Sequence, residues 1–173
     1  MADLLDSGAR REFESGAVRD ITEGKGRCDL LPLDVLAAFF TVDGTPDRVF
    51  MGLSNYVGFG LVRELYGVLD AFNEYHWRDN RTMMLEAAKQ YEDGAKKYAE
   101  RNWEKGIPLH CYIDSGVRHY LKFLRGDTDE PHDRAFVWNI LCAIRTHNYK
   151  PEFIDLPFNA KKEKNNEQTS SIK

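Results

Sequence analysis

The stretch RTMMLEAAKQYEDGAKKYAERN, residues 81–102, decides the fold class of this chain. At a helical rotation of about 100° per residue, its apolar side chains fall within about 100° of arc, as on a helix face packed against a core. These side chains are Met84, Ala87, Ala88, Tyr91, Ala95 and Tyr98. Asn80 is a suitable N-cap before the stretch, and Gly106-Ile107-Pro108 ends the unit after it. The spacing therefore predicts an amphipathic helix over residues 81–102.

Helical spacing recurs on both sides of this stretch. It predicts further helices over residues 30–42, 59–75, 109–125 and 132–146. Residues 43–58 contain three glycines and a proline and are predicted to be a loop, and no segment shows the alternation of a β-strand. Residues 1–29 are polar, glycine-rich and predicted to be mostly irregular. We therefore expect an all-α fold, a small helical bundle with an irregular N-terminal arm.

Length and composition limit the organisation of the chain. Its 173 residues suit one domain, which we place at residues 1–158, and the polar residues 159–173 are predicted to be a disordered tail. The net charge of −4 argues against general binding of nucleic-acid polymers. No run approaches the roughly 18 apolar residues that span a bilayer, and the three cysteines form no C-x-x-C pair. We expect no membrane partner and a reducing, cytoplasmic setting.

Two of the helical faces carry charged pairs. Glu92 and Lys96 are four residues apart, and so are Asp114 and Arg118. Such spacing is typical of an ion pair on a helix surface, worth about 0.3–0.5 kcal/mol. His119 points nearly opposite the apolar residues of its own helix. These groups are either ordinary surface contacts or parts of a site, and their spacing leaves both interpretations open.

The last predicted helix carries a stripe of small residues interrupted by His132 and Asn139. Ala135 and Ala143 complete the stripe at spacings of three and four residues. Small residues leave room into which the two polar side chains would project. A buried contact between His132 and Asn139 that serves only packing is an equally weighted interpretation.

His132-Asp133 also resembles the dyad of HD-type metal phosphohydrolases. In that family a further histidine lies upstream, for which His110 or His119 could serve. The family's downstream aspartate is harder to place, because Asp155 lies past the last predicted helix. The match rests on two adjacent residues and is therefore weak.

Basic residues gather in two places. Lys25 and Arg27 lie in the glycine-rich arm, and a second group lies near an aromatic side chain. The second group comprises Lys96, Lys97, Arg101 and Lys105, with Trp103 among them. Cations beside glycine-rich backbone suit polyphosphate oxygens, and Trp103 or a tyrosine could stack on a base. A solvated basic surface is the alternative.

Three blocks, taken together, resemble the dATP/dGTP diphosphohydrolase family of tailed bacteriophages, which is related to MazG-like all-α nucleotide pyrophosphohydrolases. The first block is GAVRD (16–20), EGKGR (23–27) and DLLP (29–32). The second is YEDGAKKY (91–98) and RNWEKGIP (101–108). The third comprises Asp114-Ser115, Arg118-His119, Gly126-Asp127, Pro131-His132 and Trp138-Asn139. The resemblance covers about residues 13–42 and 85–144, so residues 43–83 look like an insertion.

The resemblance implies hydrolysis of a purine deoxynucleoside triphosphate to the monophosphate and pyrophosphate. It implies Mg²⁺ held by carboxylates, for which Glu92 and Asp114 are the best candidates. The implied catalytic residues are His119, His132 and Asn139. The implied substrate contacts are Lys25, Arg27, Lys96 and Arg101 to phosphates, and Asn102 and Trp103 to the base or sugar. A homo-oligomer and, for a phage-encoded chain, the host cytoplasm are also implied.

The chain departs from the MazG-like pattern at two positions. MazG-like enzymes carry paired acids at E-x-x-E and E-x-x-D spacing, but Ala95 and Ala135 stand at these positions here. The metal ligands must then be rearranged or include His and Asn, which would favour Mn²⁺ over Mg²⁺. Two alternatives stay open: an HD-type enzyme that releases nucleoside and triphosphate, and a non-catalytic nucleotide-binding module that lost its metal ligands.

Overall fold

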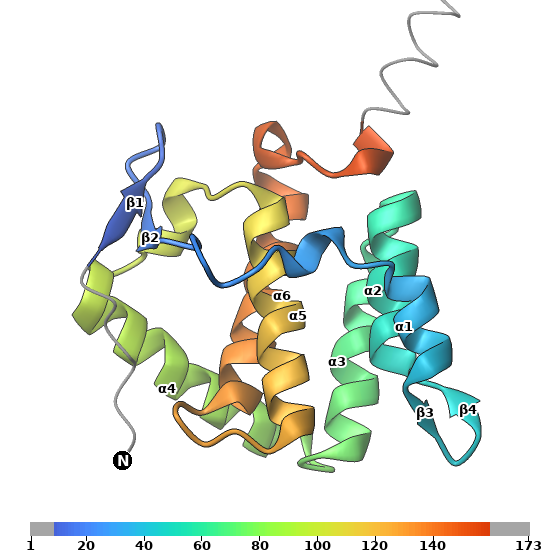
Figure 1. The fold of residues 1–173 in the computed structure, drawn as a ribbon. Coiled ribbons are helices and arrows are strands. Elements are labelled where there is room, and N and C mark those ends of the chain that lie inside the picture. Colours follow the sequence, from blue (N-terminus) through green and yellow to red (C-terminus); the bar gives the residue numbers. More distant parts are fainter. Residues whose placement is uncertain (1–8, 160–173) are drawn as a thin grey trace, which may run out of the picture.

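The computed structural model describes residues 9–159, which fold into a helical bundle (Figure 1). The helices are α1 (Leu33–Phe39), α2 (Arg48–Phe59), α3 (Arg63–Tyr75), α4 (Asn80–Tyr98), α5 (Leu109–Arg125) and α6 (His132–Tyr149), with short 3₁₀ turns η1 (Cys28–Leu30), η2 (Asn102–Lys105) and η3 (Pro151–Phe153). Two antiparallel hairpins, β1 (Arg10–Glu12) with β2 (Val18–Asp20) and β3 (Thr41–Val42) with β4 (Thr45–Pro46), are the strands of the described part. The all-α prediction is confirmed.

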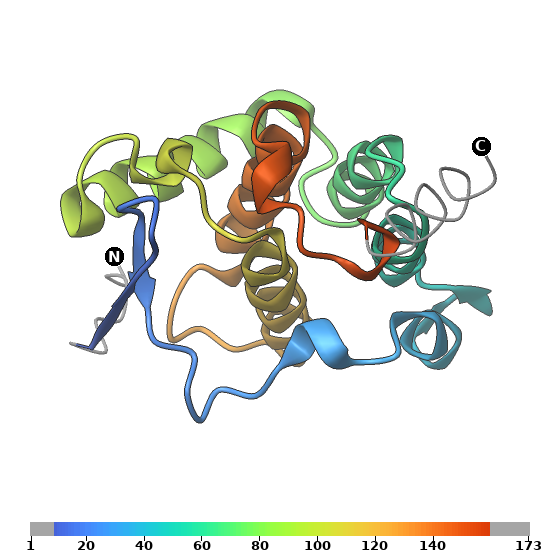
Figure 2. The same ribbon diagram turned by 90° about the horizontal axis from the view of Figure 1, so that it is seen from above.

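Helices α5 and α6 lie side by side in the middle of the bundle in Figures 1 and 2. The helix α4 and the β1–β2 hairpin flank them on one side, and α1, α2 and α3 flank them on the other. Ile113 and Val117 of α5 and Phe136 and Ile140 of α6 are fully buried. Burial of such side chains from water is the main favourable term in folding. Within residues 9–159, no helix is long and apolar enough to cross a membrane.

The prediction of a loop over residues 43–58 is wrong, because Arg48–Phe59 form helix α2. Asp47 caps this helix, accepting hydrogen bonds from the N–H groups of Val49 and Phe50 at 2.8 and 3.1 Å. Gly52 lies inside the helix because a Cβ there would come within 2.6 Å of Val68 Cγ2 on α3. Gly52 therefore allows α2 to pack closely on α3, and it does not mark a turn of the chain.

Helices α2 and α3 form part of the core. Phe72 of α3 is fully buried, and its ring lies 4.7 Å from that of Phe136 and 5.8 Å from that of Tyr120. Tyr120 in turn donates to the Asp47 carboxylate at 2.7 Å. Residues 43–83 include these two helices and cover one side of α5 and α6. Their status as an insertion relative to the family pattern stays a prediction.

The N-terminal arm is more ordered than expected. Residues Arg10–Glu12 pair with Val18–Asp20, so the prediction that this region has no strand is wrong. Tertiary contacts hold this short hairpin: the Asn102 side chain makes two hydrogen bonds with the backbone of Val18, at 2.9 and 2.8 Å. Asp20 accepts from Lys97 and Tyr98 on α4, each at 2.8 Å. A pattern of three-residue strands carries too little periodicity to reveal them.

Helix α4, which was predicted over residues 81–102, ends earlier than predicted. It stops at Tyr98, because Ala99 (φ 99°) and Arg101 (φ 54°) take positive φ values that an α-helix excludes. Its buried face is also slightly rotated, with Met83 buried and Met84 39% exposed. The first predicted helix, 30–42, is realised as η1 and the shorter α1. Of the predicted disordered tail, residues 160–173 lie outside the described residues.

An ion pair joins the start of α5 to the segment after α6. Asp155 accepts a hydrogen bond from the His110 backbone N–H at 2.9 Å and contacts the His110 ring. The hydrogen bond to Asp155, followed by one to Cys111, raises the pKa of His110 from 6.5 to about 10. The protonated form therefore stabilises the fold. That stabilisation is fully present below pH 6.5 and is lost as the pH rises towards 10.

We expect the melting temperature of His110→Gln to fall less than that of wild type between pH 6.5 and pH 10. The two falls in melting temperature should differ by about 2–5 °C. The His110–Asp155 pair contributes at most about 1 kcal/mol to the free energy of unfolding, because Asp155 is 40% exposed and solvent screens the pair. Calorimetry at both pH values measures it. Equal falls in the two proteins would mean that His110 carries no extra proton in the folded state.

Candidate functional site

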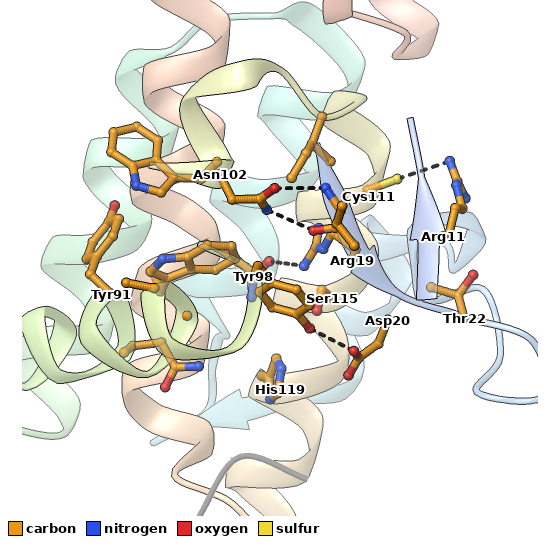
Figure 3. A pocket seen from close by; sticks show the side chains of 18 of the residues that line it. Arg11, Arg19, Asp20, Thr22, Tyr91, Tyr98, Asn102, Cys111, Ser115 and His119 are labelled. Carbon is orange, nitrogen blue, oxygen red and sulfur yellow. Dashed lines mark hydrogen bonds between the residues drawn. The ribbon is translucent and has the colours of Figure 1, made fainter. Parts of the chain in front are cut away.

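A cavity of about 1020 Å³ lies between α4, α5, α6 and the β1–β2 hairpin (Figure 3). Cys111, Ser115, His119 and Lys122 line it from α5, at spacings of three and four residues that place them on one face. From Cys111 to Lys122 the helix rises about 16 Å. Ligand pockets usually have volumes of about 300–1,000 Å³, so the cavity can hold a ligand as long as a nucleotide.

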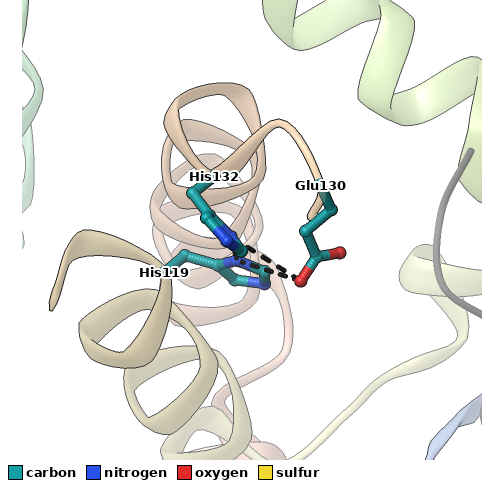
Figure 4. Close-up of side chains that lie close together, drawn as sticks. All are labelled: His119, Glu130 and His132. Carbon is teal, nitrogen blue, oxygen red and sulfur yellow. Dashed lines mark hydrogen bonds and ion pairs between the residues drawn. The ribbon is translucent and has the colours of Figure 1, made fainter. Parts of the chain in front are cut away.

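Two histidines and a glutamate meet near the C-terminal end of α5 (Figure 4). His119 of α5 and His132, the first residue of α6, place their Nδ1 atoms 3.0 Å apart. The Glu130 Oε1 atom lies 3.7 Å from His119 Nδ1 and 3.6 Å from His132 Nδ1. We call these three residues the His–Glu cluster; His119 and Glu130 line the cavity, and His132 is buried behind them.

The hydrogen bond of His132 to Asp129 sets its orientation. His132 Nε2 lies 2.7 Å from Asp129 Oδ1, and hydrogen bonds from Lys122 and His132 hold the pKa of Asp129 well below its usual range. The Asp129 carboxylate is thus an acceptor to which Nε2 donates, and the Nδ1 atom of the ring faces His119 and Glu130. A carboxylate that fixes an imidazole in this way is typical of metal-ligating histidines.

Burial keeps His119 neutral. Loss of solvation, followed by the nearby charge of His132, lowers the pKa of His119 from 6.5 to about 3. At neutral pH its imidazole is therefore uncharged, as the imidazole of a metal ligand must be.

The spacing of the His–Glu cluster also fits a shared ion. Ligand atoms about 2.1 Å from one ion stand about 3.0–3.4 Å apart in octahedral or tetrahedral arrangements, close to the 3.0–3.7 Å seen here. Within residues 9–159 the other group of comparable closeness is Asp127, Asp129 and His132, which shares His132. Two imidazole nitrogens with a carboxylate suit Mn²⁺ or another transition metal better than Mg²⁺, which prefers oxygen ligands.

The opposite end of the cavity is aromatic. The ring of Tyr91 lies 5.4 Å from that of Trp103 and 6.0 Å from that of Trp138, and Tyr112 packs on the far side of Trp138 at 5.9 Å. Tyr91, Trp103 and Trp138 line the cavity, while Tyr112 supports it from behind. Such rings offer flat apolar surfaces on which a planar ligand can stack.

Arg19 of β2 reaches into the cavity and is held by α6. Its Nη2 donates to Asn139 Oδ1 at 3.0 Å, and its guanidinium lies over the Tyr112 and Trp138 rings, 5.1 and 5.7 Å from their centroids. Asn139 is itself fixed by donating to the Ala135 carbonyl at 2.8 Å. Both groups of the Asn139 amide are thus used within the protein. Its predicted catalytic role stays a prediction, and its contacts are those of a residue that positions Arg19.

The predicted metal ligands Glu92 and Asp114 lie in different surroundings. Asp114 is buried and accepts from the Cys28 N–H at 2.7 Å and from Arg118 at 2.5 Å, one contact to each carboxylate oxygen. Glu92 lines the cavity, but its side chain is 65% exposed and pairs with Lys96 at 2.5 Å. Among the residues that the structure describes, neither acid belongs to a group close enough to hold an ion. Asp114 instead anchors the N-terminal arm to α5.

The predicted substrate-binding residues divide into two sets. Lys25, Arg101, Asn102 and Trp103 line the cavity, whereas Arg27 and Lys96 are not among its lining residues. Arg118 holds the backbone near Lys25 at the cavity, donating to the Gly26 carbonyl at 2.9 Å. Arg27 makes a two-bond contact with Asp29, at 2.7 and 2.5 Å. The Asn102 amide is occupied by Val18, and Arg101 pairs with Glu104 at 2.8 Å. Lys25 and Trp103 are left as available ligand contacts.

Sequence reasoning missed Glu130, Arg19, Lys122 and Gln90, all of which line the cavity. A signal existed for two of them. Arg19 lies inside the GAVRD block, and Glu130 directly precedes Pro131-His132 of the third block. Neither lies in a predicted helix, so helical spacing alone could not associate them with the histidines.

Residues 80–155 match the family model described as dATP/dGTP diphosphohydrolase, N-terminal. The matched segment contains α4, η2, α5, α6 and η3, which include every helix that lines the cavity, whereas the β1–β2 hairpin lies before it. No curated protein and no solved structure matches the chain.

Proposed function

We propose, from the membership of residues 80–155 in the dATP/dGTP diphosphohydrolase family, that this chain hydrolyses purine deoxynucleoside triphosphates to the monophosphate and pyrophosphate. The observation that carries the proposal is the polarity of the cavity. One end is aromatic, and the other combines the His–Glu cluster with the cations Lys25, Arg118 and Lys122. The helices that build both ends belong to the matched segment.

This polarity corresponds to that of a nucleotide. A base can stack among Tyr91, Trp103 and Trp138, while the triphosphate extends along α5 towards Lys122. The phosphates carry most of the substrate's negative charge, and fixed cations that neutralise it are the usual contribution of a protein to phosphoryl transfer. The β1–β2 hairpin lines one side of the cavity through Arg11, Arg19 and Asp20 (Figure 3).

We propose His119, Glu130 and His132 as the residues that would hold a divalent ion. When bound, such an ion supplies charge neutralisation for the phosphate oxygens and lowers the pKa of a bound water. Asp129 keeps the His132 Nδ1 atom directed at this position, and burial keeps His119 neutral. The donor set favours Mn²⁺, with Mg²⁺ as the weaker candidate. Homo-oligomer formation and the relation to MazG-like enzymes stay predictions.

The arrangement favours this reaction over an HD-type mechanism. The HD interpretation needs Asp133 beside His132 at the ion, but Asp133 pairs with His76 at 3.0 Å and belongs to neither ion-binding group within residues 9–159. His110, the alternative upstream histidine, is engaged with Asp155 and Cys111.

Separation of the reaction products tests the proposal. We expect dGTP or dATP, incubated with the protein and Mn²⁺, to give the monophosphate and pyrophosphate in equal amounts on ion exchange, because in the proposed reaction water attacks the α-phosphorus and pyrophosphate is the leaving group. Protein dialysed against a chelator, and dCTP as substrate, are the controls and should react more slowly. Appearance of dGDP with phosphate, or of deoxyguanosine with triphosphate, would contradict the proposal, and nucleotide binding without turnover would support the non-catalytic alternative.

A further inference from the structure

Cys111, His110 and Asp155 form a chain of interacting side chains at the N-terminal end of α5. The His110 Nδ1 atom contacts the Asp155 carboxylate, and the Nε2 atom of the same ring lies 3.3 Å from Cys111 Sγ. A thiol, an imidazole within reach of it and a third group that orients the imidazole are the parts of an activated cysteine nucleophile. The proposed hydrolysis uses none of these three side chains, so their arrangement needs its own explanation.

Three sources of positive charge lie around Cys111 Sγ. Arg11 of β1 donates to it from Nη2 at 3.8 Å (Figure 3). Cys111 is the third residue of α5, where the free N–H groups of the first helical turn carry partial positive charge. The hydrogen bond to Asp155, followed by that to Cys111, raises the pKa of His110 to about 10, so the ring is protonated at neutral pH. Such donors favour the thiolate, which is the nucleophilic form of cysteine.

The other two cysteines are governed by burial instead. Cys142 is fully buried on α6, and burial raises the pKa of its thiol to about 12. Cys28 is half-buried in the N-terminal arm, and burial is also the main cause that raises the pKa of its thiol. Both thiols therefore keep their protons at neutral pH, and they serve as internal comparisons for Cys111.

We propose that Cys111 is a nucleophilic modification site that reacts with low-molecular-weight disulfides, an inference that does not depend on the proposed function. The Cys111 thiolate attacks one sulfur of the disulfide, and a new S–S bond joins the protein to that half. The original S–S bond breaks, and the other half leaves with its electron pair and takes the proton from His110 Nε2. One protein thiol and one disulfide thus give one mixed disulfide and one free thiol.

A small disulfide can approach Cys111 from the cavity. Cys111 lines the cavity one helical turn before Ser115, although it is only 6% exposed. The guanidinium beside its sulfur belongs to Arg11, which is exposed and can move aside without disturbing the core. An adduct on Cys111 would project into the cavity and compete with any ligand bound there.

The order in which the three cysteines react tests the proposal. Wild-type protein is treated with excess hydroxyethyl disulfide near neutral pH, and mass spectrometry of its peptides follows the mixed disulfide at each cysteine. We expect Cys111 to react at least about tenfold faster than Cys28 and Cys142. Exposure alone predicts the opposite order for Cys28, which is half-buried whereas Cys111 is buried. Faster modification of Cys28 than of Cys111 would overturn the proposal.

His110→Gln tests whether the imidazole activates the sulfur. The rate at Cys111 should fall by about tenfold, while the rates at Cys28 and Cys142 stay as in wild type. A purely structural effect would loosen this end of α5 and raise the rate at Cys111, so the two explanations differ in sign. His76→Gln is the matched control, because His76 also pairs with an aspartate and is partly exposed on the other side of the bundle. An unchanged or higher rate at Cys111 in His110→Gln would contradict the proposal.

Asp155→Asn gives a second test through the other end of the chain of side chains. The substitution keeps the shape of Asp155 and removes the charge that holds the proton on His110. We expect the rate at Cys111 to fall in this variant also, and an unchanged rate would contradict the proposal. Thermal melting identifies a variant that fails to fold, in which case the other variant and the order of reaction in wild type decide.

Discussion

Replacing His132 by alanine is expected to lower the rate of dGTP hydrolysis by about 100-fold or more. His132 supplies one of the two imidazole nitrogens of the His–Glu cluster, and its hydrogen bond to Asp129 sets the orientation of its ring. Initial rates of pyrophosphate release in the presence of Mn²⁺ measure the effect. Spin-resonance titration of Mn²⁺ should show weaker binding in the same variant, and circular dichroism should confirm that the fold is kept.

Asp133→Asn is the matched control for His132→Ala. Asp133 is adjacent in sequence, but its carboxylate pairs with His76 on α3, and both side chains are partly exposed. We expect the variant to keep its hydrolysis rate within about twofold, because a partly exposed ion pair on α3 and α6 contributes little. A loss as large as that of His132→Ala would contradict the His–Glu cluster and support an HD-type site.

Replacing Asp114 by alanine is expected to lower the free energy of unfolding by about 2–4 kcal/mol. The Asp114 carboxylate is buried and accepts from the Cys28 N–H and from Arg118, which is itself only 15% exposed. Its removal takes the carboxylate partner from Arg118, which keeps its bond to the Gly26 carbonyl, leaves the Cys28 N–H without its acceptor, and loosens the arm that carries Lys25. Urea unfolding followed by circular dichroism measures the change.

Asp70→Ala provides the comparison for Asp114→Ala, because Asp70 lies exposed on α3. Its free energy of unfolding should change by no more than about 0.5 kcal/mol. If Asp114→Ala unfolds like Asp70→Ala but no longer binds Mn²⁺, then Asp114 is a metal ligand, as the family resemblance implied, and its assignment as an anchor is wrong.

The sequence predicted the long helices because each has enough turns for its apolar stripe to repeat. Helices α4, α5 and α6 were found within a few residues of their ends in this way. Helix α2 was missed because Gly52 and Gly58 imitate a loop, although Gly52 is required by contact with Val68. The β1–β2 hairpin was missed because Asn102 and Lys97, which are distant from it in the sequence, supply the contacts that hold it.

The candidate site was predicted in part. His119 and His132 were selected on separate helices, and the antiparallel packing of α5 and α6 brings them together. Glu130 was missed because it lies in the turn between these helices, where periodicity gives no signal. For Asp114 and Arg118 the spacing allowed both an ion pair and a metal ligand. Only the packing of the arm, through the Cys28 N–H, shows that both carboxylate oxygens are already used.

In the proposed reaction the cavity directs water to the α-phosphorus of a bound deoxynucleoside triphosphate. Hydrolysis of dGTP in water labelled with a heavy oxygen isotope, followed by mass spectrometry of both products, tests it most directly. We expect one labelled oxygen in dGMP and none in pyrophosphate. Label in pyrophosphate would place the attack on the β-phosphorus, and labelled deoxyguanosine or free triphosphate would show a different reaction; either result would rule out attack at the α-phosphorus.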